Sequence, residues 1–231
     1  MIPKYSKLLI PLSKIPICTF NSLVTYLYHN FSGSSFLLVQ EKIDGIHISV
    51  RFGKQKLEVF SRSGNPIENS RLDKGLKYEI VEKLYKSDLF RAVEEGLIFY
   101  LEYLPRKKPS YLKIEYRNDA RGKFYLLDIY SEPEKRFLSP LLLGEIAFKY
   151  HLPMPKSYYK LQRINKQIIE RIVRNIVRRK YKSEISKDGI PEGIVLKAYT
   201  DGDLMGIKIR YYEDCEVLKS LQKSLRGETR I

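Results

Sequence analysis

The sequence predicts an α+β protein that forms a single domain over residues 1–231. Residues 46–52 alternate apolar and polar side chains, which is the two-residue period of a half-buried strand. Residues 160–182 carry apolar side chains at helical spacing, which predicts an amphipathic helix. The chain has 231 residues, which is long enough to bury a sizeable core. It is 43% hydrophobic and shows no linker or low-complexity tract.

Strands are predicted near the start of the chain. Residues 36–40 form a continuous apolar run that ends in polar residues. The strand at 46–52 leads through a hairpin turn at Gly53–Lys56 into a further strand at 57–60. These segments therefore predict a small antiparallel arrangement.

One helical region and two central strands are predicted next. Widely spaced apolar residues over Leu76–Val93 predict one helix or a broken pair, with Gly96 as its stop. The dense apolar runs at 97–103 and 123–130 predict strands that are covered on both faces.

The second half of the chain combines helices with two final strands. Ser139 and Pro140 predict the start of a short helix, because serine caps unpaired N–H groups and proline is tolerated in a first turn. That helix is expected to end before Pro153. Strands at 192–198 and 205–211 close the fold.

The charge of the chain favours a polyanionic partner. It has 42 Lys and Arg against 27 Asp and Glu, a formal net charge of +15. Attraction to phosphates is independent of sequence, so this excess favours nucleic acid over a merely soluble basic surface. The polar face of the 160–182 helix is almost wholly basic. This face is either solvated or docks RNA or DNA. Its basic residues are Arg163, Lys166, Arg171, Arg174, Arg178, Arg179, Lys180 and Lys182.

The two cysteines predict neither a disulfide framework nor a zinc site. Cys18 and Cys215 have no neighbouring cysteine or histidine at metal-ligand spacing, and a reducing compartment fits this usage. Prolines and lysines interrupt the apolar residues near the N-terminus, so we expect no signal peptide and no membrane span. A cytoplasmic protein is expected, or a nuclear one in a eukaryote.

Six short motifs occur in a fixed order: Lys42-Ile43-Asp44-Gly45, Ser61-Arg62-Ser63-Gly64, Glu102, Asp128, Glu192-Gly193-Ile194-Val195-Leu196-Lys197 and Lys208-Ile209-Arg210. Over about residues 36–212, this set resembles the covalent nucleotidyltransferase superfamily of ATP-dependent polynucleotide ligases and mRNA capping enzymes. The resemblance implies a nucleotidyltransferase (ligase adenylation) fold, with mostly antiparallel sheets flanked by helices.

The resemblance implies a covalent mechanism centred on Lys42. Its amine would attack the α-phosphate of ATP and form lysyl-AMP, with Lys197, Lys208 and Arg210 stabilising the phosphates. A lysine attacks phosphorus only as a neutral amine, so neighbouring positive charge or desolvation must favour loss of its proton. Glu192 would help to place a divalent ion, Mg²⁺ or Mn²⁺.

The resemblance also implies a set of nucleotide-binding residues. Glu41 would hold the base, Leu127 and Val195 would pack on its two faces, and Glu102 would accept a hydrogen bond from the ribose. Arg62 would contact ribose and phosphate, while Asp44 and Gly45 complete the lysine motif. The family usually has glycine where this chain has Leu101, an aromatic residue at 127 and lysine at 210.

The short segment after the last motif favours an RNA substrate. Only 21 residues come after Arg210, so no C-terminal OB-fold domain is expected and a compact RNA ligase fits best. The segment Lys113–Arg117 is also similar to RNA ligase sequences. The expected partners are ATP and RNA ends, in nicked duplex or single strands, with no membrane and an undefined protein partner.

Three alternatives remain open on the sequence. The first is a minimal ATP-dependent DNA ligase, and the second is a capping guanylyltransferase that uses GTP. The third is a degenerate RNA-binding module that keeps the fold without the chemistry, which the departures at Leu101, Leu127 and Arg210 would fit.

Overall fold

A computed structural model of the chain describes residues 5–17, 19–53, 56–87, 89 and 96–227. Its contacts divide the chain into two compact units. One comprises Leu8–Ile43 with Lys156–Ile231 and is called the Lys42 unit. The other comprises Met1–Lys7 with Asp44–Pro155 and is called the Glu102 unit.

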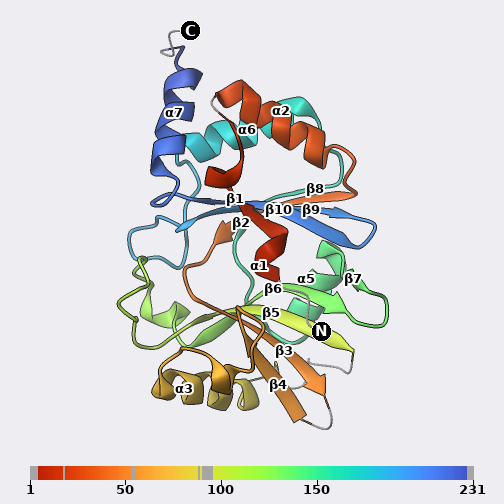
Figure 1. The fold of residues 1–231 in the computed structure, drawn as a ribbon, viewed down its shortest axis with the longest axis vertical. Helices are drawn as coiled ribbons and strands as arrows, with labels where there is room; N and C mark the ends of the chain where they lie inside the picture. Colours follow the sequence, from red (N-terminus) through yellow and green to blue (C-terminus); the bar gives the residue numbers. More distant parts are fainter. Residues whose placement is uncertain (1–4, 18, 54–55, 88, 90–95, 228–231) are drawn as a thin grey trace. The chain divides into compact units, whose positions relative to one another are not determined.

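The Lys42 unit is built on a five-stranded sheet in the order β1-β10-β9-β2-β8 (Figure 1). β1 pairs parallel with β10, and the other three pairings are antiparallel. The strands are β1 (Leu9–Pro11), β10 (Asp203–Arg210), β9 (Gly193–Thr200), β2 (Phe36–Lys42) and β8 (Ser157–Leu161).

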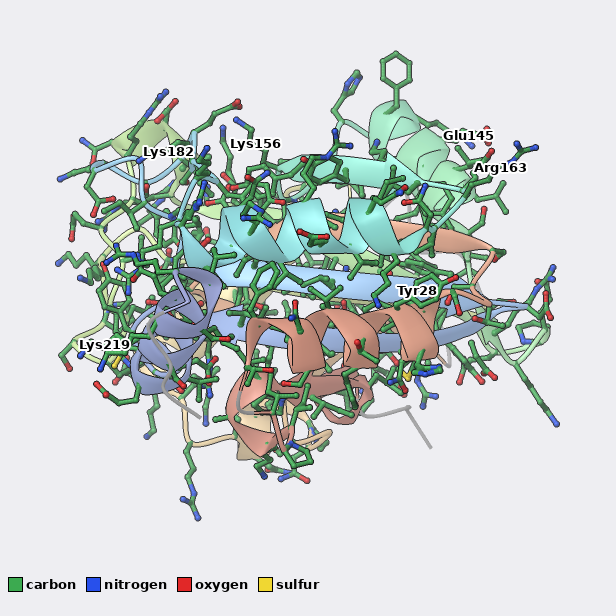
Figure 2. All side chains as sticks on the ribbon, turned by 90° about the horizontal axis from the view of Figure 1, so that it is seen from above. Tyr28, Glu145, Lys156, Arg163, Lys182 and Lys219 are labelled. Carbon is green, nitrogen blue, oxygen red and sulfur yellow. The ribbon has the colours of Figure 1, made fainter. Side chains whose placement is uncertain are left out.

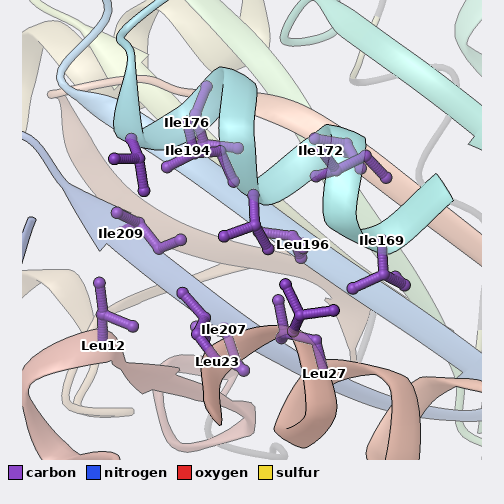
Figure 3. Packing of buried hydrophobic residues seen from close by; sticks show 14 of the residues in the cluster. Leu12, Leu23, Leu27, Ile169, Ile172, Ile176, Ile194, Leu196, Ile207 and Ile209 are labelled. Carbon is purple, nitrogen blue, oxygen red and sulfur yellow. The ribbon is translucent and has the colours of Figure 1, made fainter. Parts of the chain in front are cut away.

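Helices cover one face of this sheet. Figure 2 shows α2 and α6 side by side over the sheet, and Figure 3 shows the apolar side chains packed between the helices and the sheet. The Thr19 hydroxyl accepts a hydrogen bond from the Ser22 N–H (3.1 Å), and the Asn165 side chain accepts one from the Ile168 N–H (2.8 Å). These caps begin α2 and α6. The helical elements are η1 (Leu12–Lys14), α2 (Phe20–Phe31), α6 (Lys166–Val177) and α7 (Cys215–Leu225).

The Glu102 unit has a second five-stranded sheet, in the order β4-β3-β5-β6-β7. All of its pairings are antiparallel. The register pairs Gly53 with Lys56 across β3 and β4, as the predicted hairpin requires, while turn residues 54–55 lie outside the described residues. The strands are β4 (Lys56–Ser61), β3 (Ile46–Gly53), β5 (Leu97–Leu104), β6 (Lys123–Ser131) and β7 (Arg136–Phe137).

Two helices cover one face of this second sheet. Ile80 and Leu84 of α3 and Leu143 and Ala147 of α5 join the same buried cluster as Leu101 of β5. Asp73 and Ser139 begin these helices by accepting hydrogen bonds from backbone N–H groups of the first turn. The helical elements are α1 (Tyr5–Leu8), η2 (Ile67–Asn69), α3 (Lys74–Tyr85), η3 (Asn118–Ala120) and α5 (Pro140–Lys149).

The predicted α+β class is confirmed, with mostly antiparallel strands flanked by helices. The helix expected over 160–182 is wrong in its extent. Residues 157–161 form β8, because they pair with β2, and α6 covers only Lys166–Val177. Arg179 has φ of 50°, which α-helix geometry does not allow.

The expected extension of α3 toward Val93 falls largely outside the described residues. That residues 1–231 form one domain without an OB-fold stays a prediction. Within the described residues, no helix has the length and hydropathy needed to cross a membrane.

Candidate nucleotide-binding site

The motif residues of the Lys42 unit gather on one face of its sheet. The register aligns Lys42 with Gly193 and Arg210, and Gln40 with Val195 and Lys208. Alternate residues of a strand point to opposite faces. The core under α2 and α6 takes the odd positions of β2 and β10 and the even positions of β9. The opposite face therefore carries Lys42, Val195, Lys197, Lys208 and Arg210.

Glu192 lies against the candidate nucleophile. The Lys42 amine is 2.5 Å from Glu192 Oε2, and their side chains are 21% and 8% exposed. The amine also lies 3.3 Å from the Ile43 carbonyl oxygen. Attack on phosphorus requires the lone pair of the Lys42 nitrogen, so the contact with Glu192 must open for the reaction.

The next residue, Gly193, permits the close approach of β9 and β10. A Cβ atom at this position would lie 1.8 Å from the Ile209 carbonyl oxygen. Only a residue without a side chain fits that spacing. Gly193 also pairs with Lys42 in the neighbouring strand β2. The close approach of β9 and β10 therefore occurs at the register position of the candidate nucleophile.

Two further lysines on this face are buried. Lys197 is 2% exposed and Lys208 is 9% exposed. Val195 pairs with Lys208 and lies two residues before Lys197 on β9. Arg210 forms an ion pair with Glu213, and its Nε atom is buried without a hydrogen-bond partner in the described structure. Cations held out of water interact with phosphates far more strongly than exposed ones do.

Glu41 points to the opposite face from Lys42. It is 3% exposed, and burial raises the pKa of its carboxyl from 4.5 to about 7, against the lowering influence of Ser183 and Lys156. One of its carboxyl oxygens is buried without a hydrogen bond among the described residues. The side chain therefore lies apart from the lysine face, and its predicted role in holding the base stays a prediction.

Glu41 is expected to make stability fall as pH rises. Its pKa is higher in the folded chain than the ordinary 4.5, so the folded state binds the proton more tightly. The stabilisation is present below pH 4.5 and is lost as pH rises through about 7. From pH 5 to pH 8, wild type should lose about 2 kcal/mol more unfolding free energy than Glu41→Gln.

Urea unfolding at both pH values measures this difference. Glu145→Gln is the matched control, since Glu145 is exposed. Parallel pH dependences for wild type and Glu41→Gln would contradict the assignment.

In the Glu102 unit, the motif residues Asp44 and Gly45 are held by hydrogen bonds. The Asp44 N–H donates to the Tyr116 hydroxyl (2.6 Å), and its carboxylate accepts from the backbone N–H of Ile114 (3.0 Å). Gly45 donates its N–H to Glu102 Oε1 (3.1 Å), and a Cβ there would lie 2.8 Å from the Glu102 side chain. The segment at 113–117 thus supports the lysine motif directly.

Glu102 is also positioned by an aromatic group. His47 Nδ1 lies 3.6 Å from Glu102 Oε2. The imidazole stacks on Tyr5, whose ring centroid is 5.4 Å away, and Tyr5 stacks in turn on Tyr100. The Tyr5 hydroxyl donates a hydrogen bond to the buried carboxylate of Asp128. These contacts limit the orientations that Glu102 can adopt.

Leu127 sits at an irregularity in β6. The register with β5 shifts between Tyr100, which faces Asp128, and Leu101, which faces Leu126, so Leu127 is the extra residue. An inserted residue of this kind redirects the side chains next to it. Leu127 is half-buried, and its predicted packing on the base stays a prediction.

Arg62 lines a polar pocket of about 670 Å³ within the Glu102 unit. No acidic side chain occurs among the described residues that line it. Such a lining suits an anion, and the contact of Arg62 with ribose and phosphate stays a prediction. The other polar lining residues are His47, Ser61, Ser63, Asn65, Asn69, Ser70 and Arg71.

The basic face of α6 is partly used for packing inside the Lys42 unit. The guanidinium of Arg174 lies 5.4 Å from the ring centroid of Phe20, and that of Arg179 lies 5.3 Å from the ring centroid of Tyr211. Arg174 also pairs with Glu170 (2.6 Å). Arg178, which directly follows α6, is exposed and takes no part in these contacts, so it offers the clearest test of RNA docking on this face.

The donors present fit a divalent ion that is shared with phosphates. In the described part of the chain, no cluster of three or more His, Cys, Asp or Glu side chains has ligand geometry. Mg²⁺ is commonly bound by one or two carboxylates together with substrate phosphates and water. Glu192, 6% exposed beside Lys42, provides one such carboxylate.

The family is established by comparison with known sequences. A family model described as RNA ligase matches residues 36–209, well over half of the chain. The chain therefore belongs to the RNA ligase family, and the predicted membership of the nucleotidyltransferase superfamily is confirmed. A search of curated proteins gave no match.

Solved ligases share the fold. A Naegleria gruberi RNA ligase, solved as a mutant with ATP and Mn, has a TM-score of 0.56 and 16% identity, covering 87% of this chain and 56% of its own. An archaeal ATP-dependent RNA ligase has a TM-score of 0.59 and 18% identity, and the match covers 85% of this chain and 48% of the ligase. A putative ATP-dependent DNA ligase from Aquifex aeolicus has a TM-score of 0.52 and 20% identity, and the match covers 81% of this chain and 46% of the ligase. The predicted fold is confirmed, and this chain spans about half the length of these structures.

Several supporting residues were not predicted from the sequence. His47, Tyr5 and Tyr116 act through contacts with residues 55, 123 and 72 positions away, respectively. His47 carried a signal as a polar residue of the alternating strand at 46–52, and Tyr116 lies in the segment Lys113–Arg117 that is similar to RNA ligase sequences.

Proposed function

We propose that this chain is an ATP-dependent RNA ligase that joins 5′-phosphate and 3′-hydroxyl ends through lysyl-AMP on Lys42. The observation that carries the proposal is the gathering of Lys42, Val195, Lys197, Lys208 and Arg210 on one sheet face, with Glu192 2.5 Å from the Lys42 amine. Membership of the RNA ligase family supports RNA as the substrate.

The first step is loading of the lysine. The neutral Lys42 amine attacks the α-phosphorus of ATP, an N–P bond forms, and the bond to the bridging oxygen breaks with release of pyrophosphate. Lys197, Lys208 and Arg210 neutralise the charge that develops on the phosphate oxygens. Glu192 would hold Mg²⁺ or Mn²⁺, which supplies further positive charge to the phosphates.

The AMP then passes to RNA. A 5′-phosphate oxygen attacks the lysyl-AMP phosphorus, which breaks the N–P bond and returns the amine of Lys42. A 3′-hydroxyl next attacks the activated 5′-phosphate, forms the phosphodiester and releases AMP. Glu102, which contacts His47 and accepts a hydrogen bond from the Gly45 N–H, would accept a further hydrogen bond from a ribose hydroxyl.

Mass spectrometry of the purified protein tests the proposal. After incubation with ATP and Mg²⁺, we expect the mass to increase by one AMP group, and peptide mapping to place it on Lys42. Sealing assays on single-stranded RNA, nicked RNA and nicked DNA then separate an RNA ligase from a DNA ligase. Label from GTP alone would favour a capping guanylyltransferase, and no adduct at all would favour a non-catalytic RNA-binding module.

The cysteine usage fits an RNA ligase of a reducing compartment. In the described structure, Cys215 is a free thiol. We place the protein in the cytoplasm, or in the nucleus of a eukaryote.

Glu192→Gln is expected to weaken binding of the metal ion that AMP loading requires. The amide keeps the size of the side chain but removes the negative charge that favours a cation. The Mg²⁺ concentration for half-maximal AMP loading should rise by about tenfold. Glu216→Gln, at an exposed glutamate of α7, serves as the control. A Mg²⁺ titration that coincides with wild type would remove Glu192 from the metal site.

A further inference from the structure

A second large pocket lies in the Glu102 unit, away from its motif residues. It has a volume of about 770 Å³ and is bordered by the C-terminal end of α3, the start of β6 and the end of α5. Phe124 and Ala147, which line it, belong to the buried cluster on the helix-covered face of the sheet. Glu102 pairs with Tyr125 rather than with a lining residue, and successive side chains alternate between faces.

The rim of this pocket is positively charged. Lys83, Lys86 and Lys123 line it, and no acidic side chain does so among the described residues. Lys86 pairs with Glu82, but both side chains are exposed (70% and 38%), and a surface pair of this kind is easily exchanged for another anion. Lys123 is exposed and forms no ion pair within the described residues. The rim therefore suits phosphates.

The same pocket presents aromatic and apolar surface. Phe148 lines it and is 84% exposed, although it is a large apolar residue on a well-formed helix. Tyr150 lies beside it, with the Lys149 amine 4.8 Å from its ring centroid. The pocket is otherwise lined mainly by apolar side chains, including Leu152 and Met154. An exposed ring next to lysines suits a stacked nucleobase.

We propose that this pocket binds unpaired nucleotides of the RNA substrate, at a site separate from the one that loads AMP. A base would stack on Phe148 or Tyr150, and the neighbouring phosphates would lie against Lys83, Lys86 and Lys123. The pocket volume falls in the range of sites that hold small ligands of nucleotide size. This inference rests on the proposed function, because it takes RNA as the substrate. The planar ring flanked by amines favours RNA over an acidic peptide.

Binding of a fluorescent single-stranded RNA, followed by anisotropy, tests the inference. Phe148→Ala should weaken binding by about fivefold or more, as expected for the loss of one base stack. Lys123→Ala should lower the slope of log K against log salt by about 0.7, the value for one phosphate contact on a single strand. Leu141→Ala is the control for Phe148→Ala, because Leu141 is exposed on the same helix, α5, outside the pocket. Lys74→Ala is the control for Lys123→Ala, because Lys74 is an exposed lysine at the start of α3, outside the pocket. Both controls should leave the RNA affinity and the salt slope unchanged.

A direct readout comes from cross-linking with RNA that contains 5-iodouracil. We expect cross-links to map to Phe148 or Tyr150 in wild type. RNA affinities for Phe148→Ala and Lys123→Ala equal to those of the controls would overturn the site. So would an acidic peptide that binds wild type but not Phe148→Ala while RNA binding is the same in both.

The AMP adduct distinguishes this inference from the proposed function. Loading of Lys42 requires no RNA, so Phe148→Ala should form the adduct as wild type does. Normal loading with unchanged RNA affinity overturns only the second site. A wild-type protein that forms no adduct overturns the proposed ligase activity instead.

Discussion

Replacing Lys42 by arginine is expected to abolish the AMP adduct. Arginine keeps the positive charge and can retain the ion pair with Glu192, which is 2.5 Å from the lysine amine. The guanidinium stays protonated in proteins, however, and provides no lone pair for attack on phosphorus. Loading should therefore fall below detection, a loss of at least about 10³-fold, as is typical when a covalent nucleophile is removed.

Intact-mass measurement after incubation with ATP and Mg²⁺ checks this result. Lys160→Arg is the matched control, because Lys160 is an exposed lysine of β8 in the same sheet. It should load AMP as wild type does. The unfolding midpoint of Lys42→Arg should stay close to that of wild type, so a loss of loading reports chemistry and not folding. Undiminished adduct in Lys42→Arg would show that another residue is the nucleophile.

Gly193→Ala is expected to cause the largest loss of stability. The added Cβ would lie 1.8 Å from the Ile209 carbonyl oxygen, 2.8 Å from the Ile209 carbonyl carbon and 2.9 Å from Arg210 Cα. All three are backbone atoms, so no side chain can rotate out of the way. Strand β10 would have to move away from β9, which should cost about 3 kcal/mol, the upper part of the range for overpacking.

Urea unfolding at neutral pH measures this cost. Gly33→Ala is the control, since its Cβ would meet no atom within 4 Å. AMP loading by Gly193→Ala should also fall, because Lys42 and Arg210 flank Gly193 in the sheet. An unfolding free energy within about 0.5 kcal/mol of wild type, the scatter of ordinary surface substitutions, would contradict the close approach of β9 and β10.

The two units carry different groups of motif residues. The Lys42 unit supplies the lysines and Glu192, whereas the Glu102 unit supplies Glu102 and Arg62. Consecutive residues of one motif, Ile43 and Asp44, belong to different units. A single substitution in one unit therefore leaves the motif residues of the other unit unchanged.

Local patterns predicted most of the strands. The segments 36–40, 46–52, 57–60, 97–103 and 123–130 lie within strands β2 to β6, because alternation and dense apolar runs are properties of a few neighbouring residues. The helix capped by Ser139 was predicted for the same reason. In contrast, α2 and α7 were not predicted, and the last two residues of β8 were assigned to a helix. Residues 157–161 become a strand only by pairing with β2, which is far away in the sequence.

The sequence by itself determined the α+β class, the strands that carry the motifs and the identity of the candidate nucleophile. Each depends on local periodicity or on residue types at fixed spacing. Only the tertiary structure decided that Lys42, Lys197 and Lys208 share a sheet face and that Glu41 does not. It also decided that His47 lies against Glu102 and stacks on Tyr5. Register and packing between distant segments set these relations, and they arise only once the strands have paired and the core has formed.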